Sequence, residues 1–294
     1  MTDNLFEVLA QEDDSGQWAF GTGFTDEFAR IDRTAPAGVD RSDLVAYCLM
    51  LGDDSLVAAQ RMAEWCSRGP ELEEDIALAN IALDLLGHAR ALLARAAELA
   101  GDGRDADGFA FFREAADFRN VGLVEPDLGP GPGGDFASTM ARLLVFSTWR
   151  LAAYQRLTGS REPVIAGVAA KGAKELAYHR EHAVLWVLRL AGGTDHSRSR
   201  MIAGLEAVWP YLPELFEGHQ IERRLAAAGI AVDPAELRDE VVALLREVLR
   251  AAGLDWPQTR PVDCSGRAGR HTPELAALLA EMQSVARAMP GARW

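Results

Sequence analysis

Long segments of helical periodicity, without any run of strand-like alternation, most constrain what this chain can fold into. In the first segment, apolar residues recur at three- and four-residue steps from Leu44 to Trp65. This spacing predicts an amphipathic helix that begins near Asp40 and ends near Gly69-Pro70. The chain has 294 residues, of which 49% are hydrophobic, so it can bury a sizeable helical core.

The same periodicity predicts six further helices, with capping residues and helix breakers at their ends. Their expected ranges are 71–99, 136–157, 163–190, 195–228, 233–252 and 272–289. Asp135, Asp233 and Thr272 are the expected N-caps, and the helix over 195–228 is expected to break near Gly218. Four long helices followed by shorter ones favour an all-α fold, a four-helix bundle with additional C-terminal helices.

The start of the chain differs from the rest in pattern and in charge. Residues 1–39 show no sustained periodicity, and residues 1–43 hold ten acidic side chains against three arginines. We therefore predict an acidic, flexible arm over 1–39 and one bundle domain over 40–294. The net charge of the whole chain is −14, which argues against a nucleic-acid partner because phosphate would be repelled.

Several features predict a cytoplasmic protein. The chain has three cysteines and no C-x-x-C pair, namely Cys48, Cys66 and Cys264. This usage fits a reducing compartment. The first residues lack the basic and apolar regions of a secretory signal. Asn80 and Asp84 interrupt the apolar stretch over 76–86, so no membrane-spanning segment is expected.

Polar residues lie on helix faces that should be buried. In the nearly apolar helix over 71–99, Asn80, Asp84 and His88 are spaced i, i+4, i+8 and share one face. In the helix over 163–190, Glu175 and His179 lie in the middle of the core stripe. Carboxylates and imidazoles that project inward from bundle helices are the donors of a di-iron site, which takes Glu from two helices and Glu-x-x-His pairs from two others.

The spacing here departs from that pattern. Each histidine follows its acid by four residues rather than three, and the stretch 136–158 contains no Asp or Glu. The first helix offers Asp54 and Glu64, but Arg61 lies between them and would compete with a cation. We therefore favour a paired polar network without metal. The alternative is a di-iron site with irregular ligands at Asp84, His88, Glu175 and His179.

The chain's only two lysines, Lys171 and Lys174, lie beside this motif. One hypothesis is that a lysine, with Arg61 or His88, supplies positive charge where a metal would sit. The alternative for Lys171 is an exposed i, i+4 ion pair with Glu175. The candidates for the network, with no catalytic, cofactor-binding or metal role assigned, are Asp54, Arg61, Glu64, Asn80, Asp84, His88, Lys171, Lys174, Glu175 and His179.

Two other features receive local roles. His271 precedes the expected cap Thr272, so we expect it to cap the helix or to lie at the surface. The Gly- and Pro-rich stretch over 129–134 follows no strand, so it is interpreted as a flexible connector rather than a phosphate-binding loop.

Seven separated stretches resemble the C subunits of 1,2-phenylacetyl-coenzyme A epoxidases. They are LGDDSLV (51–57), RMAEW (61–65), PELEEDIALANIALDLLG (70–87), AELAG (97–101), KELAYH (174–179), GIAVDP (229–234) and the ending over 271–294. The resemblance runs in order over about residues 43–294 and leaves the arm outside.

The resemblance implies a ferritin-like bundle that acts in phenylacetate catabolism. In that family a homologous A subunit holds the di-iron site, and the C subunit is a non-catalytic structural partner that stabilises it. Further small subunits and a reductase with flavin, an iron-sulfur centre and NADPH complete the complex, which epoxidises the ring of phenylacetyl-coenzyme A. The alternatives are a self-sufficient di-iron oxygenase and a free-standing ferritin-like interaction protein.

Overall fold

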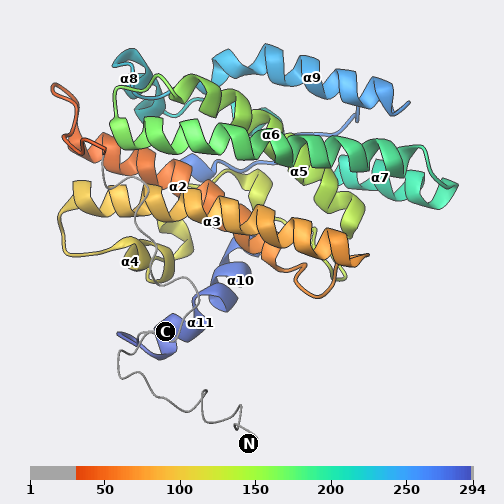
Figure 1. Ribbon diagram of the computed structural model, residues 1–294, viewed down its shortest axis with the longest axis horizontal. Helices are drawn as coiled ribbons and strands as arrows, with labels where there is room; N and C mark the ends of the chain where they lie inside the picture. Colours follow the sequence, from red (N-terminus) through yellow and green to blue (C-terminus); the bar gives the residue numbers. More distant parts are fainter. Residues whose placement is uncertain (1–30, 293–294) are drawn as a thin grey trace, which may run out of the picture. The chain divides into compact units, whose positions relative to one another are not determined.

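Two helix hairpins form the bundle in the computed structural model, which describes residues 31–292 (Figure 1). The first hairpin consists of α2 (Arg41–Ala63) and α3 (Leu72–Ala100), and the second of α5 (Phe136–Leu157) and α6 (Pro163–Ala191). The two helices of each hairpin pack along each other, and α3 packs against α6 to join the hairpins. On the other side, α2 and α5 both contact the short helix η2 (Gly122–Val124).

A single long crossover over residues 101–135 connects the hairpins. It contains α4 (Ala106–Phe111), η1 (Ala115–Asp117) and η2. The crossover returns the chain to the end of the bundle where α2 finishes, so that α5 runs in the same direction as α3 (Figure 1). One long crossover is the connection used in ferritin-like bundles.

Shorter helices follow α6 and pack around the bundle. They are α7 (Asp195–Val208), η3 (Trp209–Tyr211), η4 (Pro213–Phe216), α8 (Gln220–Ala227), η5 (Pro234–Leu237), α9 (Arg238–Ala251), η6 (Gly266–Ala268), α10 (Pro273–Met282) and α11 (Ser284–Ala288). α7 packs on α5 and α6, α9 packs on α5, and α8 packs on α2. Residues 31–292 contain no strand, so the prediction of an all-α bundle with additional C-terminal helices is confirmed.

Local chemistry explains where the long helices begin and end. The Asp135 side chain accepts a hydrogen bond from the Ser138 amide at the start of α5, as predicted for an N-cap. Glu162 caps α6 in the same way, and Pro163 takes its first position. At the end of α3, Gly101 adopts a left-handed conformation with φ 65°, which suits a residue without a side chain.

Two expectations about helix ends are wrong, and a third is met only in part. α2 ends at Ala63, several residues before Gly69-Pro70, and the chain then turns through Ser67 at a positive φ. The helix expected over 195–228 does break at Gly218, since residues 217–219 have no regular structure, but the interruption already begins at 209–216, where Pro210 and Pro213 lie in short 3₁₀ helices. Thr272 precedes α10, but its hydroxyl makes no capping hydrogen bond.

The predicted arm over 1–39 falls mostly outside the described residues. Residues 31–39 lack regular structure, and Arg33 forms an ion pair with Glu98 on α3. The span Asp32–Trp294 forms one compact unit. The first helix of the bundle begins at residue 41, one residue after the start of the predicted domain over 40–294.

By length and composition alone, α3 could cross a membrane, contrary to the expectation from Asn80 and Asp84. Within the bundle, however, its buried side packs against α2 and α6. Only 44% of its most apolar window is buried, so apolar side chains of α3 remain at the surface of this chain.

Candidate functional site

Asp54 is the centre of a buried ion cluster that joins α2 to α5 and to the C-terminal segment. Its carboxylate binds the guanidinium of Arg150 on α5 and that of Arg267, whose Nη2 lies 2.7 Å away. The Val121 amide also donates to Asp54, at 2.8 Å. All three side chains are shielded from solvent. One carboxylate therefore faces two guanidiniums in the space between α2 and α5.

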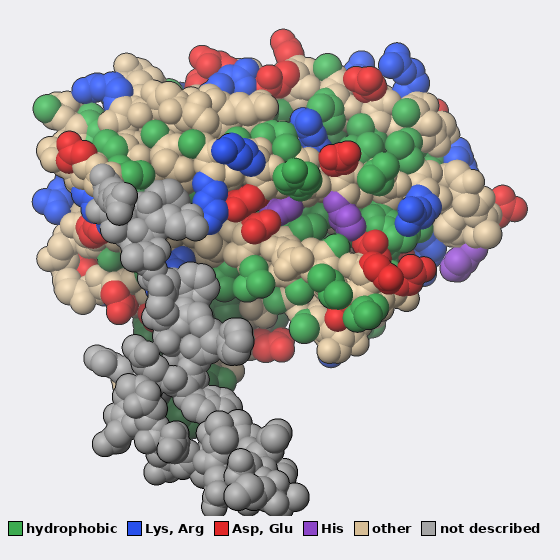
Figure 2. All heavy atoms as spheres, viewed as in Figure 1, with side chains coloured by type: hydrophobic (Ala, Val, Ile, Leu, Met, Phe, Trp, Pro, Cys, Tyr) green, Lys and Arg blue, Asp and Glu red, His purple; other side chains and the backbone are tan. Residues whose placement is uncertain are grey.

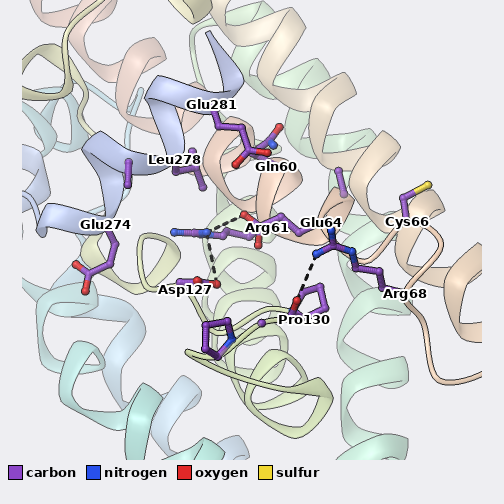
Figure 3. Close-up of a pocket in the computed structure, with 14 residues that line it drawn as sticks. Gln60, Arg61, Glu64, Cys66, Arg68, Asp127, Pro130, Glu274, Leu278 and Glu281 are labelled. Atoms are coloured by element: carbon purple, nitrogen blue, oxygen red, sulfur yellow. Dashed lines mark hydrogen bonds and ion pairs between the residues drawn. The ribbon is translucent and has the colours of Figure 1, made fainter. Parts of the chain in front are cut away.

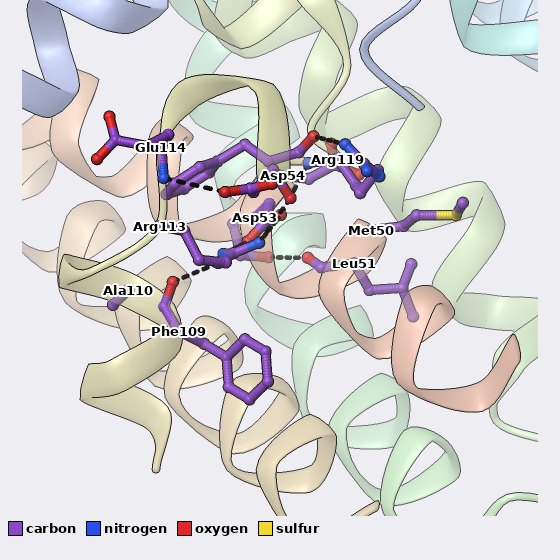
Figure 4. Close-up of polar contacts among 12 residues, drawn as sticks. Met50, Leu51, Asp53, Asp54, Phe109, Ala110, Arg113, Glu114 and Arg119 are labelled. Carbon is purple, nitrogen blue, oxygen red and sulfur yellow. Dashed lines mark hydrogen bonds and ion pairs between the residues drawn. The ribbon is translucent and has the colours of Figure 1, made fainter. Parts of the chain in front are cut away.

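The neighbouring residue Asp53 holds the crossover in place (Figure 4). Arg113 pairs with both oxygens of its buried carboxylate, and the Arg119 amide donates to Oδ2 at 2.9 Å. The Arg113 guanidinium also lies 4.1 Å from the Phe118 ring centroid. The two adjacent aspartates of α2 thus have different ion-pair partners, Asp53 in Arg113 of the crossover and Asp54 in Arg150 of α5 and Arg267 of the C-terminal segment.

Histidine and carboxylate side chains pair across the seam between α3 and α6. His88 Nε2 lies 2.6 Å from Glu175 Oε2, and His179 Nε2 lies 3.0 Å from Asp84 Oδ2. One further turn along, Glu74 accepts a hydrogen bond from Trp186 at 2.8 Å and lies 3.2 Å from His182. Each imidazole is matched to a single carboxylate, and these pairs tie the two hairpins together.

Glycine lets the seam close beside His88. A Cβ on Gly172 of α6 would lie 2.6 Å from the Tyr154 ring and 2.8 Å from the His88 ring. A side chain at this position would push both rings away. The close approach buries the ring of His88 and leaves its Nδ1 without a partner among the described residues.

The two lysines lie on the outer side of α6. Lys171 Nζ is 3.9 Å from Glu175 Oε1, and the Lys171 side chain is 45% exposed. Lys174 is exposed as well, and so is Asn80 on α3. This is the geometry of the surface i, i+4 pair rather than of an ammonium group in the bundle centre. The buried positive charge comes instead from Arg150 and Arg267.

Arg61 and Glu64 lie at the end of α2, away from Asp54. Arg61 Nη1 is 2.7 Å from Glu64 Oε1, and Nη2 donates to the Glu125 carbonyl. Both residues line an open pocket of about 660 Å³ between the end of α2, the loop over 127–132 and α10 (Figure 3). Burial raises the pKa of the Glu64 carboxyl, and the positive charge of Arg61 partly opposes this shift.

Arginines hold the loop that was interpreted as a flexible connector. Arg68 donates to the Pro130 carbonyl at 3.3 Å, and Arg142 donates to the Pro126 carbonyl at 2.7 Å. Burial, together with the charge of Arg61, lowers the pKa of Arg142 to about 10. Arg68 therefore anchors the loop near its start, and Arg142 anchors the residues just before it.

His271 is neither a cap nor a surface residue, contrary to expectation. Its side chain is buried, with Nδ1 2.6 Å from Glu125 Oε1 and Nε2 2.9 Å from the Phe118 carbonyl. Burial of the ring opposes its protonation, but the hydrogen bond and charge of Glu125 outweigh this effect and raise the pKa of His271. His271 thus fastens the C-terminal segment to the crossover.

Sequence reasoning missed the arginines that carry most of the buried charge. Arg95 pairs with the fully buried Glu162 at 2.7 Å, and neither residue was singled out. Arg150 is not among the predicted residues, because the prediction for the helix over 136–157 depends only on its lack of Asp and Glu. A useful signal was available, since an arginine inside a helix that is apolar on almost all sides must meet a carboxylate.

The donor set does not fit a di-iron centre. Asp54 is already matched by two guanidiniums, and each imidazole of the seam is held by one carboxylate. Among residues 31–292, no three His, Cys, Asp or Glu side chains gather in a way that could hold a metal ion. α5 contributes arginine to the cluster, where a bundle metal site needs a carboxylate.

An exposed apolar surface covers α3 and α6 beside the seam (Figure 2). On α3, Leu72, Ile76, Ala79, Leu83 and Leu86 follow a four- and three-residue alternation, and Leu83 is 64% exposed. On α6, Tyr178 and Leu185 are seven residues apart, and Tyr178 is 74% exposed. Histidine side chains are visible between the two apolar strips in Figure 2. We call this surface the α3–α6 face.

Comparisons with known proteins agree on one family. A family model described as phenylacetic acid catabolic protein matches residues 30–294. Among curated proteins, the chain is similar to the C subunit of 1,2-phenylacetyl-CoA epoxidase from Escherichia coli (strain K12), with 44% identity over 253 residues. That match spans 86% of this chain and 100% of the relative. Both findings agree with the resemblance that the sequence motifs indicated.

Proposed function

Since the chain belongs to the family of phenylacetic acid catabolic proteins, we propose that it works as the C-type subunit of a 1,2-phenylacetyl-CoA epoxidase complex. Its role in that complex is structural. It pairs with a homologous catalytic subunit, stabilises it and contributes no reacting group of its own.

The cluster around Asp54 is the observation that carries this proposal. Its carboxylate is neutralised by Arg150 and Arg267, so it cannot accept a divalent cation unless both guanidiniums move away. The seam is closed in the same pairwise manner, with each imidazole held by one carboxylate. These ion pairs suit a bundle that is stable without a metal.

The α3–α6 face supports the pairing. Apolar residues at four- and three-residue steps are typical of a helix that packs against another helix, because this spacing keeps them on one side. Of the ten large hydrophobic side chains that are exposed among the described residues, six lie on α3 or α6. A second helical bundle that docks along these helices would bury them.

The remaining parts of the proposal concern the rest of the complex. The di-iron centre belongs to the catalytic partner, and flavin, an iron-sulfur centre and NADPH belong to the reductase. Further small subunits join them. The whole complex is cytoplasmic, in keeping with the reduced state proposed for the cysteines, which form no disulfide.

Reconstitution tests the proposal. The chain is purified alone and together with a homologous catalytic subunit, and iron content, complex formation and epoxidation of phenylacetyl-CoA are measured. We expect no stoichiometric iron and no turnover in the chain alone, a stable complex, and a catalytic partner that loses activity without this chain. Near-stoichiometric binding of two irons to the isolated chain would favour the self-sufficient oxygenase. A catalytic partner that is equally active and stable by itself would refute the structural role.

A further inference from the structure

A second pocket lies beside α9, away from the α3–α6 face and from the ion cluster. Its floor comes from η3 and η4, with Trp209 and Phe216. One wall is formed by Arg238, Val242 and Arg246, which lie at four-residue steps on one side of α9. The opposite wall is the segment over 256–261, which is tied to the floor by a hydrogen bond from the Val262 amide to the Pro210 carbonyl. α9 is the blue helix at the top of Figure 1. The pocket encloses about 350 Å³, within the range of small-molecule sites.

The charge of this pocket is opposite to that of the protein. The chain carries 44 acidic against 30 basic residues, yet the pocket is lined by two arginines and by no Asp or Glu. Within residues 31–292, neither Arg238 nor Arg246 forms an ion pair with a carboxylate. Instead the Arg238 guanidinium lies 5.8 Å from the Phe216 ring centroid, and that of Arg246 lies 5.2 Å from the Trp256 ring centroid. Aromatic rings hold both cations at the pocket without neutralising them.

The floor also contains a hydrogen-bond donor without an acceptor. Trp209 is only 4% exposed, and its indole Nε1–H finds no partner among the described residues. Its ring meets that of Trp256 edge to face, with centroids 5.0 Å apart. Buried donors are nearly always paired in folded proteins, so an unpaired one on a residue that lines a pocket is a reason to expect a ligand that reaches it.

We propose that this pocket binds a nucleotide. The guanidiniums of Arg238 and Arg246 match the phosphate oxygens, which they can bind in a bidentate manner. The aromatic side chains offer flat surfaces against which a planar base stacks. The indole of Trp209 selects a base over a plain hydrocarbon ring, because a base has ring nitrogens that accept a hydrogen bond and a phenyl ring has none.

The nucleotide could be free or could be the adenine-containing end of a larger cofactor, and the two sources share the same chemistry at the pocket. Calorimetric titration of the full-length chain separates them, with ADP and coenzyme A as probes. Adenosine, inorganic phosphate and phenylacetate serve as comparisons, since they supply the base, the anion and a carboxylate on a phenyl ring. Quenching of tryptophan fluorescence gives an independent readout, because Trp209 and Trp256 both line the pocket.

We expect saturable binding of ADP, of coenzyme A, or of both, and the one that binds more tightly identifies the source. Adenosine, inorganic phosphate and phenylacetate should all bind more weakly. Arg238→Gln and Arg246→Gln should each weaken binding by about tenfold, since each removes one guanidinium from the phosphate. Both residues are exposed, so these variants should fold normally. Trp209→Phe keeps an aromatic ring and loses the N–H, and should weaken nucleotide binding severalfold.

Arg250→Gln is the matched control. Arg250 is exposed on the same helix but does not line the pocket, so affinity should not change. The proposal is overturned if neither ADP nor coenzyme A binds at millimolar concentration, or if their binding is insensitive to Arg238→Gln and Arg246→Gln. It is also overturned if inorganic phosphate or phenylacetate binds as tightly as the nucleotide.

Discussion

The cluster around Asp54 and the seam between α3 and α6 both contain paired charged groups. They differ in whether both members of each pair are buried. Asp54, Arg150 and Arg267 are all buried, and the buried Glu222 lies 3.7 Å from Arg267 Nε, so two carboxylates compensate the two guanidiniums inside the chain. In the seam the imidazoles of His88 and His179 are buried, whereas the carboxylate side chains reach the surface, and that of Asp84 is 38% exposed. The seam then continues into the exposed apolar α3–α6 face.

This difference indicates that the cluster stabilises the fold, whereas the seam and the α3–α6 face beside it lie at a surface that a partner can cover. A compensated buried cluster needs nothing from outside, and removing one member leaves an unpaired charge in a medium of low polarity. The seam tolerates change better, because its carboxylates can be solvated by water. Its apolar borders are the part that water solvates poorly.

Replacing Asp54 should cause the largest loss of stability. Asp54→Asn leaves the buried Arg150 guanidinium without its carboxylate partner and Arg267 with Glu222 alone, and we expect the free energy of unfolding to fall by about 3–5 kcal/mol. Urea unfolding followed by circular dichroism measures this. The control is Asp102→Asn, because Asp102 pairs with Arg104 at the surface, where water screens the charges, and its loss should change stability far less. Equal effects of the two substitutions would contradict the distinction between cluster and surface.

Charges placed on the α3–α6 face should disrupt the complex without unfolding the chain. Leu83→Glu and Tyr178→Glu should each weaken binding to the catalytic partner by about 2 kcal/mol or more, as for residues central to an interface. Binding is measured by calorimetry and folding by thermal unfolding. Ile202→Glu on α7 is the control, since Ile202 is also an exposed apolar residue but lies on another helix. If all three variants bind equally well, the partner docks elsewhere.

Removing an imidazole from the seam should reduce the free energy of unfolding less than replacing Asp54 does. His88→Gln loses the contact with Glu175, and we expect a loss of about 1–2 kcal/mol in unfolding free energy because the ring is buried but the carboxylate can turn to water. Lys174→Gln on the exposed side of the same seam should change stability by less than about 0.5 kcal/mol. A loss at His88 as large as that at Asp54 would show that the seam is also a closed cluster.

The smallest effects concern pH, and two histidines should act with opposite signs. The pKa of His271 is raised in the folded state, so its contribution to stability is complete below about pH 6.5, the unfolded value, and is lost as pH rises through the folded pKa. The pKa of His182 is lowered by burial, so this residue destabilises the fold as pH falls below about 6.5.

Unfolding free energies of the wild type, His271→Gln and His182→Gln across the range over which histidine titrates test both signs. The loss caused by His271→Gln should be larger at the acid end, whereas His182→Gln should make stability less sensitive to acid. If the two variants shift the pH profile in the same direction, the assigned causes are wrong.

Much of the fold was predictable because its causes are local. The cap at Asp135, the first position of Pro163 and the Gly-terminated end of α3 depend on residues within a few positions of one another. The predicted end of α2 is wrong, because the chain turns through Ser67. The break expected near Gly218 begins earlier than predicted, because the prolines at 210 and 213 outweigh the apolar periodicity there.

The candidate site was predicted only in part. The pairing of Asp84, His88, Glu175 and His179 across two helices follows from their positions on inward faces, and the structure brings these four residues to one seam. Glu64 and Arg61 contact each other three residues apart, as their spacing allows. The partners of Asp54 could not be found by spacing, because Arg150 is 96 residues away in sequence and Arg267 is 213 away.

The sequence by itself therefore determined an all-α bundle, the order of its long helices and its resemblance to a family, because helical periodicity and capping act over a few residues. Only the tertiary structure decided which charges neutralise each other, which leucines of α3 stay exposed, and that Arg238, Arg246 and Trp209 surround one pocket. These properties arise from residues that are far apart in sequence, and their energies depend on burial, which exists only once the helices have packed.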